Sequence, residues 1–294
     1  MSDSMAMVTV GLPVYNAAPY LADAIQSIIN QTFRDWELLI VDDGSTDDSV
    51  AIARTFSDSR IRIVADGLNL GLPIRLNQIS QLAQGSLIAR MDADDIMVEG
   101  RLQIQIDYFG QHPEVDVISS FIYIIDKQNK VLGVRGSADL PNTLKGAIWG
   151  VPIAHPTVMA GKNWFLKHPY NPTNFRGQDI ELWLSTIETA KFHVITDPLL
   201  FYRELGVPYT KKYLQTSKAL RALLKKYSKQ CSHRNTLLAL LATYVKDWLY
   251  ILFNLFNSED WLLRRRSRVL HTLEQRHAQK MLAQSIQQSL TYTL

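Results

Sequence analysis

A cluster of acidic residues lies in the segment ARMDADD, residues 89–95, where Asp92, Asp94 and Asp95 fill three of four positions. It follows an apolar run directly, although like charges this close repel one another. In an extended segment residues i and i+2 point the same way, so Asp92 and Asp94 are expected to direct two carboxylates to one point. Hard cations such as Mg²⁺ and Mn²⁺ prefer oxygen ligands and are usually shared with substrate phosphates. The cluster suggests a cation site, and the alternative is a solvated acidic turn that caps the next helix.

Strand and helix patterns alternate around this cluster. Short apolar runs predict strands, and apolar residues at helical spacing predict the helices between them. Strands are expected at 7–12, 36–45, 61–65 and 86–91, and helices at 20–31, 47–56 and 72–85, the last closing on Gly85. This order indicates an α/β fold with a mostly parallel sheet, Rossmann-like, covered by helices on both faces.

Ligands of such sheets bind beyond the carboxyl ends of the strands. Three polar segments occupy these ends here, namely 11–16, 41–45 and 91–95. No G-x-G-x-x-G and no G-x-x-x-x-G-K-[ST] occurs, so the usual dinucleotide and P-loop motifs are missing.

Beyond residue 113 the pattern becomes mixed. Strands are expected at 115–125, 192–196 and 199–203, and a helix at 178–188. After Gly206 and Pro208 the chain changes to long, basic, leucine-rich helices. Two parts are therefore predicted, an α/β domain over residues 1–207 and a basic helical region over 208–294.

The two parts differ in charge. Residues 1–210 hold 16 Lys and Arg against 24 Asp and Glu, whereas residues 211–294 hold 15 against 4, and the 294-residue chain carries a net charge of +3. The single cysteine, Cys231, excludes a disulfide within the chain and fits a reducing cytoplasm. The first residues lack the basic start and long apolar core of a secretory signal.

Several motifs in order resemble one family. They are VTVGLPVYNAAPYLADAIQSIINQTFRDWELLIVDDGSTDDS, NLGLPIRLNQISQLAQGSLIARMDADD, HPTVM, QDIELWLS and LLFYR. Over roughly residues 7–204 the chain resembles the inverting glycosyltransferases of family two, which have the GT-A fold. Within that family it looks most like the bacterial enzymes that build capsule, exopolysaccharide or O-antigen repeat units.

The resemblance implies a nucleotide site at the first two strand ends. The residues that it assigns to the base, the ribose and the border of this site are Pro13, Tyr15, Asp42, Asp43, Asn69 and Arg75. A carboxylate can accept an imide N–H, and an aromatic ring can stack on a base. The alternative for VDDGSTDD is a plain turn with a helix cap. Arg75 could reach a phosphate, and the alternative for it is a surface arginine.

The resemblance also implies the cation and the base. Asp94 matches the direct ligand of Mn²⁺ or Mg²⁺, and Asp92 a ribose or water-mediated partner. Asp179 matches the general base, and Gln178 replaces the glutamate that usually precedes it. A helix cap is the alternative for Asp179, and Glu181 would be the base if the register were shifted.

Two further residues are assigned to the substrate side. His155 could lie near the acceptor, although a lone histidine is more often structural. Arg203 could face the diphosphate or a neighbouring acid.

These residues imply metal-dependent transfer of one sugar from a nucleotide-diphospho-sugar, with a UDP-sugar as the commonest donor. No Q-x-x-R-W motif follows Asp179, so polymerisation is not expected. A lipid-linked glycan acceptor at the inner face of the cell membrane is the expected partner. The rivals are a nucleotide- or glycan-binding module without turnover, and a nucleotidyltransferase, which would need a basic, glycine-rich loop after the first strand.

The basic helical region includes the apolar run 236–256, which is about long enough to span a bilayer. Lys246 and Asp247 at its centre oppose insertion. A narrow polar stripe recurs at helical spacing, formed by Ala239, Thr243, Lys246, Asp247, Tyr250 and Asn254. With WLLRRRSR at 261–268, this predicts docking on an anionic membrane surface. The alternatives are packing on the body or a homo-oligomer interface, and nucleic-acid binding is not expected.

Overall fold

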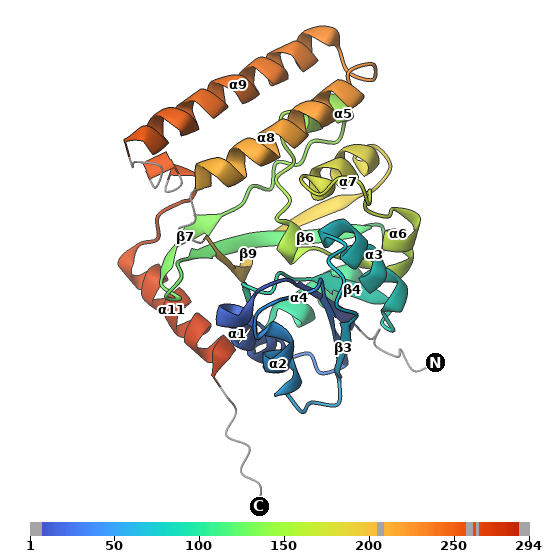
Figure 1. Cartoon of the computed structure of the whole chain (residues 1–294), viewed down its shortest axis with the longest axis vertical. Coiled ribbons are helices and arrows are strands. Elements are labelled where there is room, and N and C mark those ends of the chain that lie inside the picture. The colour runs from blue at the N-terminus through green and yellow to red at the C-terminus, as the bar shows by residue number, and fades with distance from the viewer. Residues whose placement is uncertain (1–7, 205–208, 257–260, 263–264, 288–294) are drawn as a thin grey trace, which may run out of the picture.

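The structure is a computed structural model that describes residues 8–204, 209–256, 261–262 and 265–287 (Figure 1). The strands are β1 Val8–Val14, β2 Trp36–Asp42, β3 Ile61–Ala65, β4 Leu87–Arg90, β5 Ile96–Met97, β6 Val117–Ile125, β7 Val131–Arg135, β8 Met159–Gly161 and β9 Phe192–Arg203. The helices are α1 Ala18–Ile29, α2 Ser49–Arg54, α3 Leu72–Leu82, α4 Arg101–Gln111, α5 Leu144–Ala147, the 3₁₀ helix η1 His155–Thr157, α6 Lys162–Lys167, α7 Gln178–Thr186, α8 Tyr209–Lys226, α9 His233–Leu255 and α11 Thr272–Ile286.

The strands form one sheet in the order β3-β2-β1-β4-β8-β6-β9-β5, with β7 paired to β6. Strands β1 to β4 pair in parallel, as the sequence predicts, whereas β8 runs antiparallel to both β4 and β6. Helices cover both faces of the sheet because alternate residues of the central strands point to opposite sides. On β2, Leu38 and Ile40 pack with α1, whereas Leu39 and Val41 pack with α3.

Two local predictions were wrong. The strands expected at 192–196 and 199–203 form the single strand β9, whose register against β6 shifts next to Pro198. Proline has no N–H to donate to the neighbouring strand, so Pro198 makes the strand pairing irregular without ending the strand. The third helix ends at Leu82 with Ala83 as its C-cap, so Gly85 does not cap it. Gly85 instead donates its N–H to Thr9 Oγ1 at 2.9 Å on the way into β4.

The basic helices do not form a single appendage. Helix α8 packs on α5 and α7 through Leu223, Leu224 and Tyr227, and α9 lies against its outer side (Figure 1). Helix α11 lies elsewhere, on α1, β5 and β7. There the side chains of Gln275 and Gln279 form hydrogen bonds with the backbone of Val131 at the start of β7 and of Asn129 just before it, at distances of 2.7 to 3.0 Å. The predicted boundary at residue 207 lies outside the described residues.

Two glycines with positive φ, Gly44 after β2 and Gly67 after β3, test how closely the loops that follow these strands approach each other. Gly44 has φ +72°, and a Cβ there would lie 2.9 Å from the backbone of residues 68 and 69. Gly67 has φ +75° with open space around it. Both substitutions to alanine strain the backbone, at a cost of about 1–3 kcal/mol each. We expect Gly44→Ala to lower the free energy of unfolding in denaturant titrations clearly more than Gly67→Ala, because only Gly44→Ala adds a clash. Equal losses would contradict the close approach of these two loops.

Candidate active site

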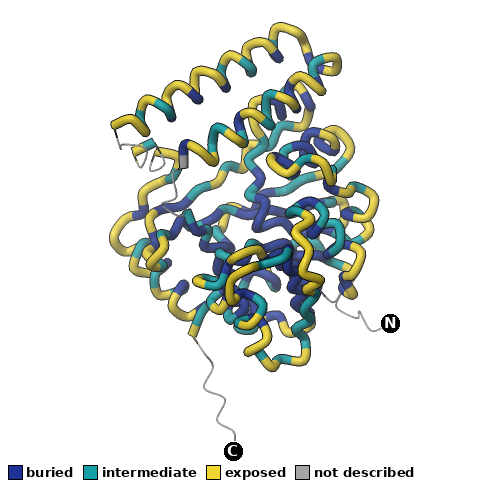
Figure 2. Tube along the Cα trace, in the orientation of Figure 1, coloured by how far each residue is buried: buried dark blue, intermediate teal, exposed yellow. Residues whose placement is uncertain are grey.

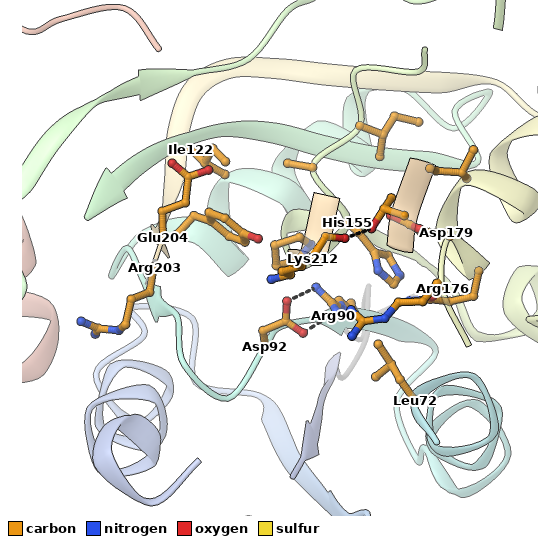
Figure 3. A pocket seen from close by; sticks show the side chains of 18 of the residues that line it. Leu72, Arg90, Asp92, Ile122, His155, Arg176, Asp179, Arg203, Glu204 and Lys212 are labelled. Atoms are coloured by element: carbon orange, nitrogen blue, oxygen red, sulfur yellow. Dashed lines mark hydrogen bonds and ion pairs between the residues drawn. The ribbon is translucent and has the colours of Figure 1, made fainter. Parts of the chain in front are cut away.

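A cleft of about 640 Å³ opens beyond the carboxyl end of β4 (Figure 3). Its floor carries Arg90, Asp92 and Asp94, and one side carries Gln178 and Asp179. Helix α8 closes another side with Lys212, Tyr213 and Thr216. Residues from β4, η1, α7, β9 and α8 therefore meet in one cavity, as expected for the edge of an α/β sheet.

The acidic cluster is a turn. Ligand oxygens of Asp92, Asp94 and Asp95 lie within 4.8 Å of one another. The N–H of Asp95 donates to the Asp92 carbonyl at 3.3 Å, so the carboxylates converge because the chain turns and not because it is extended, as the spacing argument assumed. Burial and the neighbouring Asp92 raise the pKa of Asp94 to about 6. Burial and both neighbours also raise the pKa of Asp95 well above its usual range.

Two arginines hold this turn. Arg90, buried at the end of β4, forms an ion pair with Asp92, with Nη1 2.9 Å from Oδ2. Arg203 donates its backbone N–H to Asp95 Oδ1 at 3.0 Å and its Nε–H to the Asp94 carbonyl at 2.8 Å. The Arg203 guanidinium also lies over the Tyr20 ring at 4.4 Å. Arg203 thus contacts the acidic turn, one of the two predicted outcomes, once at the Asp95 carboxylate and once at the Asp94 carbonyl.

Asp179 lies in the first turn of α7, where Gly177 is the N-cap with a left-handed φ of +77°. The capping alternative for Asp179 is therefore wrong. Its side chain lines the cleft, and burial is the main cause that raises its pKa. Gln178 is buried at the same wall. Glu181 accepts hydrogen bonds from Asn171 and Asn174 and pairs with Lys226 at 2.6 Å, so its carboxylate is committed to structural partners.

His155 is buried at the back of the cleft. Its Nε2 lies 2.8 Å from the Tyr170 hydroxyl, and its ring packs edge-on against Trp183. Burial lowers the pKa of His155 well below its ordinary value, with Arg90 as a further cause, so the imidazole is neutral.

The predicted nucleotide residues lie at the ends of β1 and β2. Tyr15 is 53% exposed, Pro13 is buried, and Asn69 is exposed. They are not among the cleft residues, but the ends of β1 and β4 are adjacent because Gly11 pairs with Arg90. The predicted residues therefore fall into two groups along one edge of the sheet.

The two aspartates after β2 differ in their partners. Asp42 Oδ2 accepts the N–H groups of Gly44 and Ser45 at 3.0 Å, and its buried Oδ1 has no hydrogen-bond partner among the described residues. Asp43 Oδ1 accepts from the N–H of Leu70 at 2.7 Å and from Nε of Arg75 at 3.0 Å.

Arg75 is fully buried, and it pairs with Asp66 as well as with Asp43. The alternative of a surface arginine is therefore wrong. Its guanidinium fixes the Asp43 carboxylate against the segment that follows β3.

The sequence prediction missed Arg90, the role of Asp95, and α8 as a wall of the cleft. An arginine at the end of an otherwise apolar strand was the available signal for Arg90, and the MDADD run contained Asp95. No pattern in the sequence indicated that Lys212, Tyr213 and Thr216 would reach the cleft, because this depends on how α8 packs.

Comparisons with known proteins agree with this arrangement, which defines an α/β nucleotide-sugar transferase of the GT-A type. The pattern of the family described as Glycosyl transferase family 2 matches residues 9–194. The chain therefore belongs to this family and is a glycosyltransferase.

Individual relatives match over part of their length. Glycosyltransferase EpsE of Bacillus subtilis is 32% identical over 62% of this chain and 66% of its own length. The O-antigen biosynthesis glycosyltransferase WbnJ of Escherichia coli is 29% identical over 75% of this chain and 90% of its own. Among these and the other similar relatives, the matched share of the relative's own length ranges from 26% to 90%.

Solved structures share the fold. The mannosyltransferase PcManGT of Pyrobaculum calidifontis, solved with GDP-Man and Mn²⁺, has a TM-score of 0.59 and 17% identity, over 97% of this chain and 86% of its own. Residues 1–349 of TarS from S. aureus, solved with UDP-GlcNAc, also have a TM-score of 0.59, with 14% identity, over 81% of this chain and 71% of that chain.

The raised pKa of Asp94 predicts a pH dependence of stability in EDTA. Its folded pKa of about 6 exceeds the ordinary 3.8, so the folded state binds more protons and stability falls as pH rises from about 4 to 6. Asp92→Asn removes a neighbouring charge and lowers the Asp94 pKa, so we expect a shallower fall. The measurement is the slope of the unfolding free energy against pH. Loss of the ion pair with Arg90 lowers the unfolding free energy by the same amount at each pH, so it does not change this slope. Asp107→Asn, on the exposed side of α4, is the control, and a slope unchanged by Asp92→Asn would contradict the coupling.

Proposed function

We propose that this glycosyltransferase transfers a single sugar, with inversion, from a nucleotide-diphospho-sugar to a glycan acceptor. The observation that carries the proposal is one cleft with an acidic turn on its floor and a carboxylate, Asp179, on its wall. A polar edge beside it, at β1 and β2, is available for the nucleotide.

The acidic turn fits a hard cation. Three carboxylates converge on one point, and buried Asp95 Oδ2 has no hydrogen-bond partner among the described residues. Asp94 would hold Mn²⁺ or Mg²⁺ directly and Asp92 would assist, while Arg90 and Arg203 keep the turn in shape. When bound, such an ion supplies positive charge for the diphosphate that leaves.

Asp179 is proposed as the general base. It would take the proton from the acceptor hydroxyl as the oxygen attacks the anomeric carbon and the bond to the diphosphate breaks. A helix N-terminus favours the negative charge that this role needs, and Asp179 lies in the first turn of α7. Neutral His155 and Gln178 border the acceptor side, where they can orient a hydroxyl without competing for the proton.

The nucleotide is proposed to bind at the ends of β1 and β2, between Tyr15 and Asn69. Tyr15 is exposed enough to stack on a base, and Pro13 shapes the strand end beneath it. The buried Oδ1 of Asp42 has no hydrogen-bond partner among the residues that the structure describes, and Asp43, held by Arg75, presents a fixed acceptor. Arg75 acts here as a positioning residue. UDP-sugars are the proposed donors, and the TarS complex with UDP-GlcNAc supports a site of this kind in the same fold.

The acceptor is proposed to be a lipid-linked glycan of surface polysaccharide synthesis, at the cytoplasmic face of the membrane. One relative, WfgD of Escherichia coli, 29% identical over 64% of this chain and 73% of its own length, is named a UDP-Glc:α-D-GlcNAc-diphosphoundecaprenol β-1,3-glucosyltransferase. In this chain Lys212 of α8 lines the cleft and offers a cation for an acceptor phosphate.

The first test is a calorimetric titration with UDP, GDP and dTDP, each with Mn²⁺ and with EDTA. We expect one nucleotide to bind, and EDTA to abolish or strongly weaken it. Absence of binding to all three by folded protein would contradict the donor site. Nucleotide binding without any donor hydrolysis or transfer would favour the alternative of a binding module without turnover.

Substitutions should separate the two carboxylate roles. Asp94→Asn removes a cation ligand, so it should weaken Mn²⁺-dependent nucleotide binding at least tenfold. Asp179→Asn should leave this binding nearly unchanged and lower transfer by at least a thousandfold. Glu181→Gln is the matched control on α7, since its carboxylate serves only structural partners, and transfer should persist. Equal loss of nucleotide binding in both variants would refute the separation.

Activity should also report the raised pKa of Asp179. The base acts only when ionised, so turnover at saturating donor and Mn²⁺ should fall on the acid side. Because burial raises the pKa, the midpoint of this fall should lie above the ordinary aspartate value of 3.8. The measurement is kcat against pH, and a midpoint at or below 3.8 would argue against Asp179 as the buried base.

A further inference from the structure

Helix α9 buries its polar side and exposes its apolar side. Four residues of the predicted polar stripe, Ala239, Thr243, Asp247 and Tyr250, are buried against α8, whereas its other two, Lys246 and Asn254, are exposed. Asp247 pairs with Arg221 of α8, and the Tyr250 ring stacks on Tyr213 at 3.9 Å. The helix therefore uses its hydrogen-bonding groups inward, the reverse of a helix on a water-soluble surface.

The outward side of α9 is a continuous apolar surface. Trp248 and Leu255 are each 72% exposed, and Val245 is 60% exposed. Figure 2 shows exposed residues along the outer side of this helix, which faces away from the sheet. We call this surface the α9 face, and it consists of Leu237, Leu238, Leu241, Tyr244, Val245, Trp248, Leu249, Leu252, Leu255 and Phe256, with Trp261 beyond its end. Exposed apolar patches of this extent mark interaction sites.

The charge around the α9 face favours a lipid surface over a second copy of this chain as its binding partner. Residues 209–255 contain nine Lys and Arg and one acid, Asp247, which is already paired. Arg234 and Lys246 are exposed on α9 itself, and Arg265 lies over the Trp261 ring at 4.0 Å. A second copy of this chain would bring two positive surfaces together, whereas an anionic lipid surface offers both apolar chains and opposite charge.

A position across the bilayer fits less well. Helix α9 is long and apolar enough to span a membrane, with a mean hydropathy of 1.4. However, one side of it is covered by α8, which contains six Lys and Arg and no acid. Lys246 and Asp247 also stand at its centre, and spanning would carry these charges into hydrocarbon.

We propose that α9 lies in the plane of an anionic membrane surface, with the α9 face in the lipid and α8 between it and the catalytic body. This membrane position rests on the proposed function in one respect only, namely that it would give the enzyme access to a lipid-linked acceptor. Lys212, Tyr213 and Thr216 of α8 line the cleft, so the helix that supports α9 also forms a wall of the active site. An acceptor anchored in the membrane would enter along α8.

Flotation with vesicles tests this on the full chain. Wild-type protein is expected to float with vesicles of phosphatidylglycerol and phosphatidylethanolamine, and less with phosphatidylcholine alone. The triple variant Leu241→Gln, Trp248→Gln, Leu252→Gln should bind at least tenfold more weakly. The matched control is Leu82→Gln, Leu132→Gln, Leu166→Gln, which changes exposed leucines on α3, β7 and α6 and should float like wild type. Alkaline carbonate should release the bound protein.

Several results would overturn the proposal. They are absence of flotation by wild type, equal flotation of the α9 triple variant, and retention after carbonate, which would indicate a spanning helix. A wild-type dimer in light scattering that the triple variant disperses would assign the α9 face to a second copy. Nucleotide binding in vesicle-free solution is measured on the same samples, and we expect the α9 variant to keep it. Absence of nucleotide binding by the wild-type protein would contradict the proposed function, whereas the flotation result would still decide whether the α9 face binds a membrane.

Discussion

The site depends on the cost of bringing three carboxylates together at the end of a buried strand. Asp92, Asp94 and Asp95 repel one another, and burial, followed by this repulsion, raises the pKa values of Asp94 and Asp95. Arg90 and Arg203 offset this repulsion from two different strands, β4 and β9. Since β4 belongs to the parallel half of the sheet and β9 to the mixed half, the turn can keep its shape only when both halves have formed. A cation bound there would relieve the same repulsion, so the repulsion among the three carboxylates affects both the stability of the fold and the binding of a cation.

The sequence predicted the part of the fold that local patterns determine. Apolar runs and helical spacing located β1 to β4 and their helices, because alternation and period are properties of neighbouring residues. It failed where distant contacts decide. Gly85 resembles a cap, yet the helix ends earlier because the loop bonds Thr9 on β1. Arg75 resembles a surface residue on an amphipathic helix, yet Asp43 and Asp66 draw it into the interior. The acidic turn was found, and Arg203 was named as a possible partner of an acid, but the geometry of the turn and its partner Arg90 were not found, because they depend on how the turn packs between β4 and β9.

The same limit applies to α8 and α9. Composition indicated basic, apolar helices and a polar stripe, but the direction of the stripe depends on what covers it. In isolation α9 would turn its polar side to water. In the structure this side faces α8, where Arg221 pairs with Asp247 and the Tyr213 ring stacks on Tyr250. A buried ion pair is weak evidence of net stabilisation, but it does fix which side of a helix faces inward.

Helix α8 then links two requirements of a transferase that acts on an anchored substrate. Its Leu223 and Leu224 hold it to α5 and α7, and α7 carries Asp179. Its residues near the N-terminal end, Lys212 and Thr216, lie in the cleft, and its outer side supports α9. Asp179, the proposed base, and the proposed acceptor wall are therefore held by one packed unit, whereas the acidic turn belongs to the sheet. An acceptor guided along α8 would meet Asp179 on the same packed unit, and it would meet the donor at the acidic turn of the sheet. This arrangement would orient the two reactants without a contact between α9 and the reacting atoms.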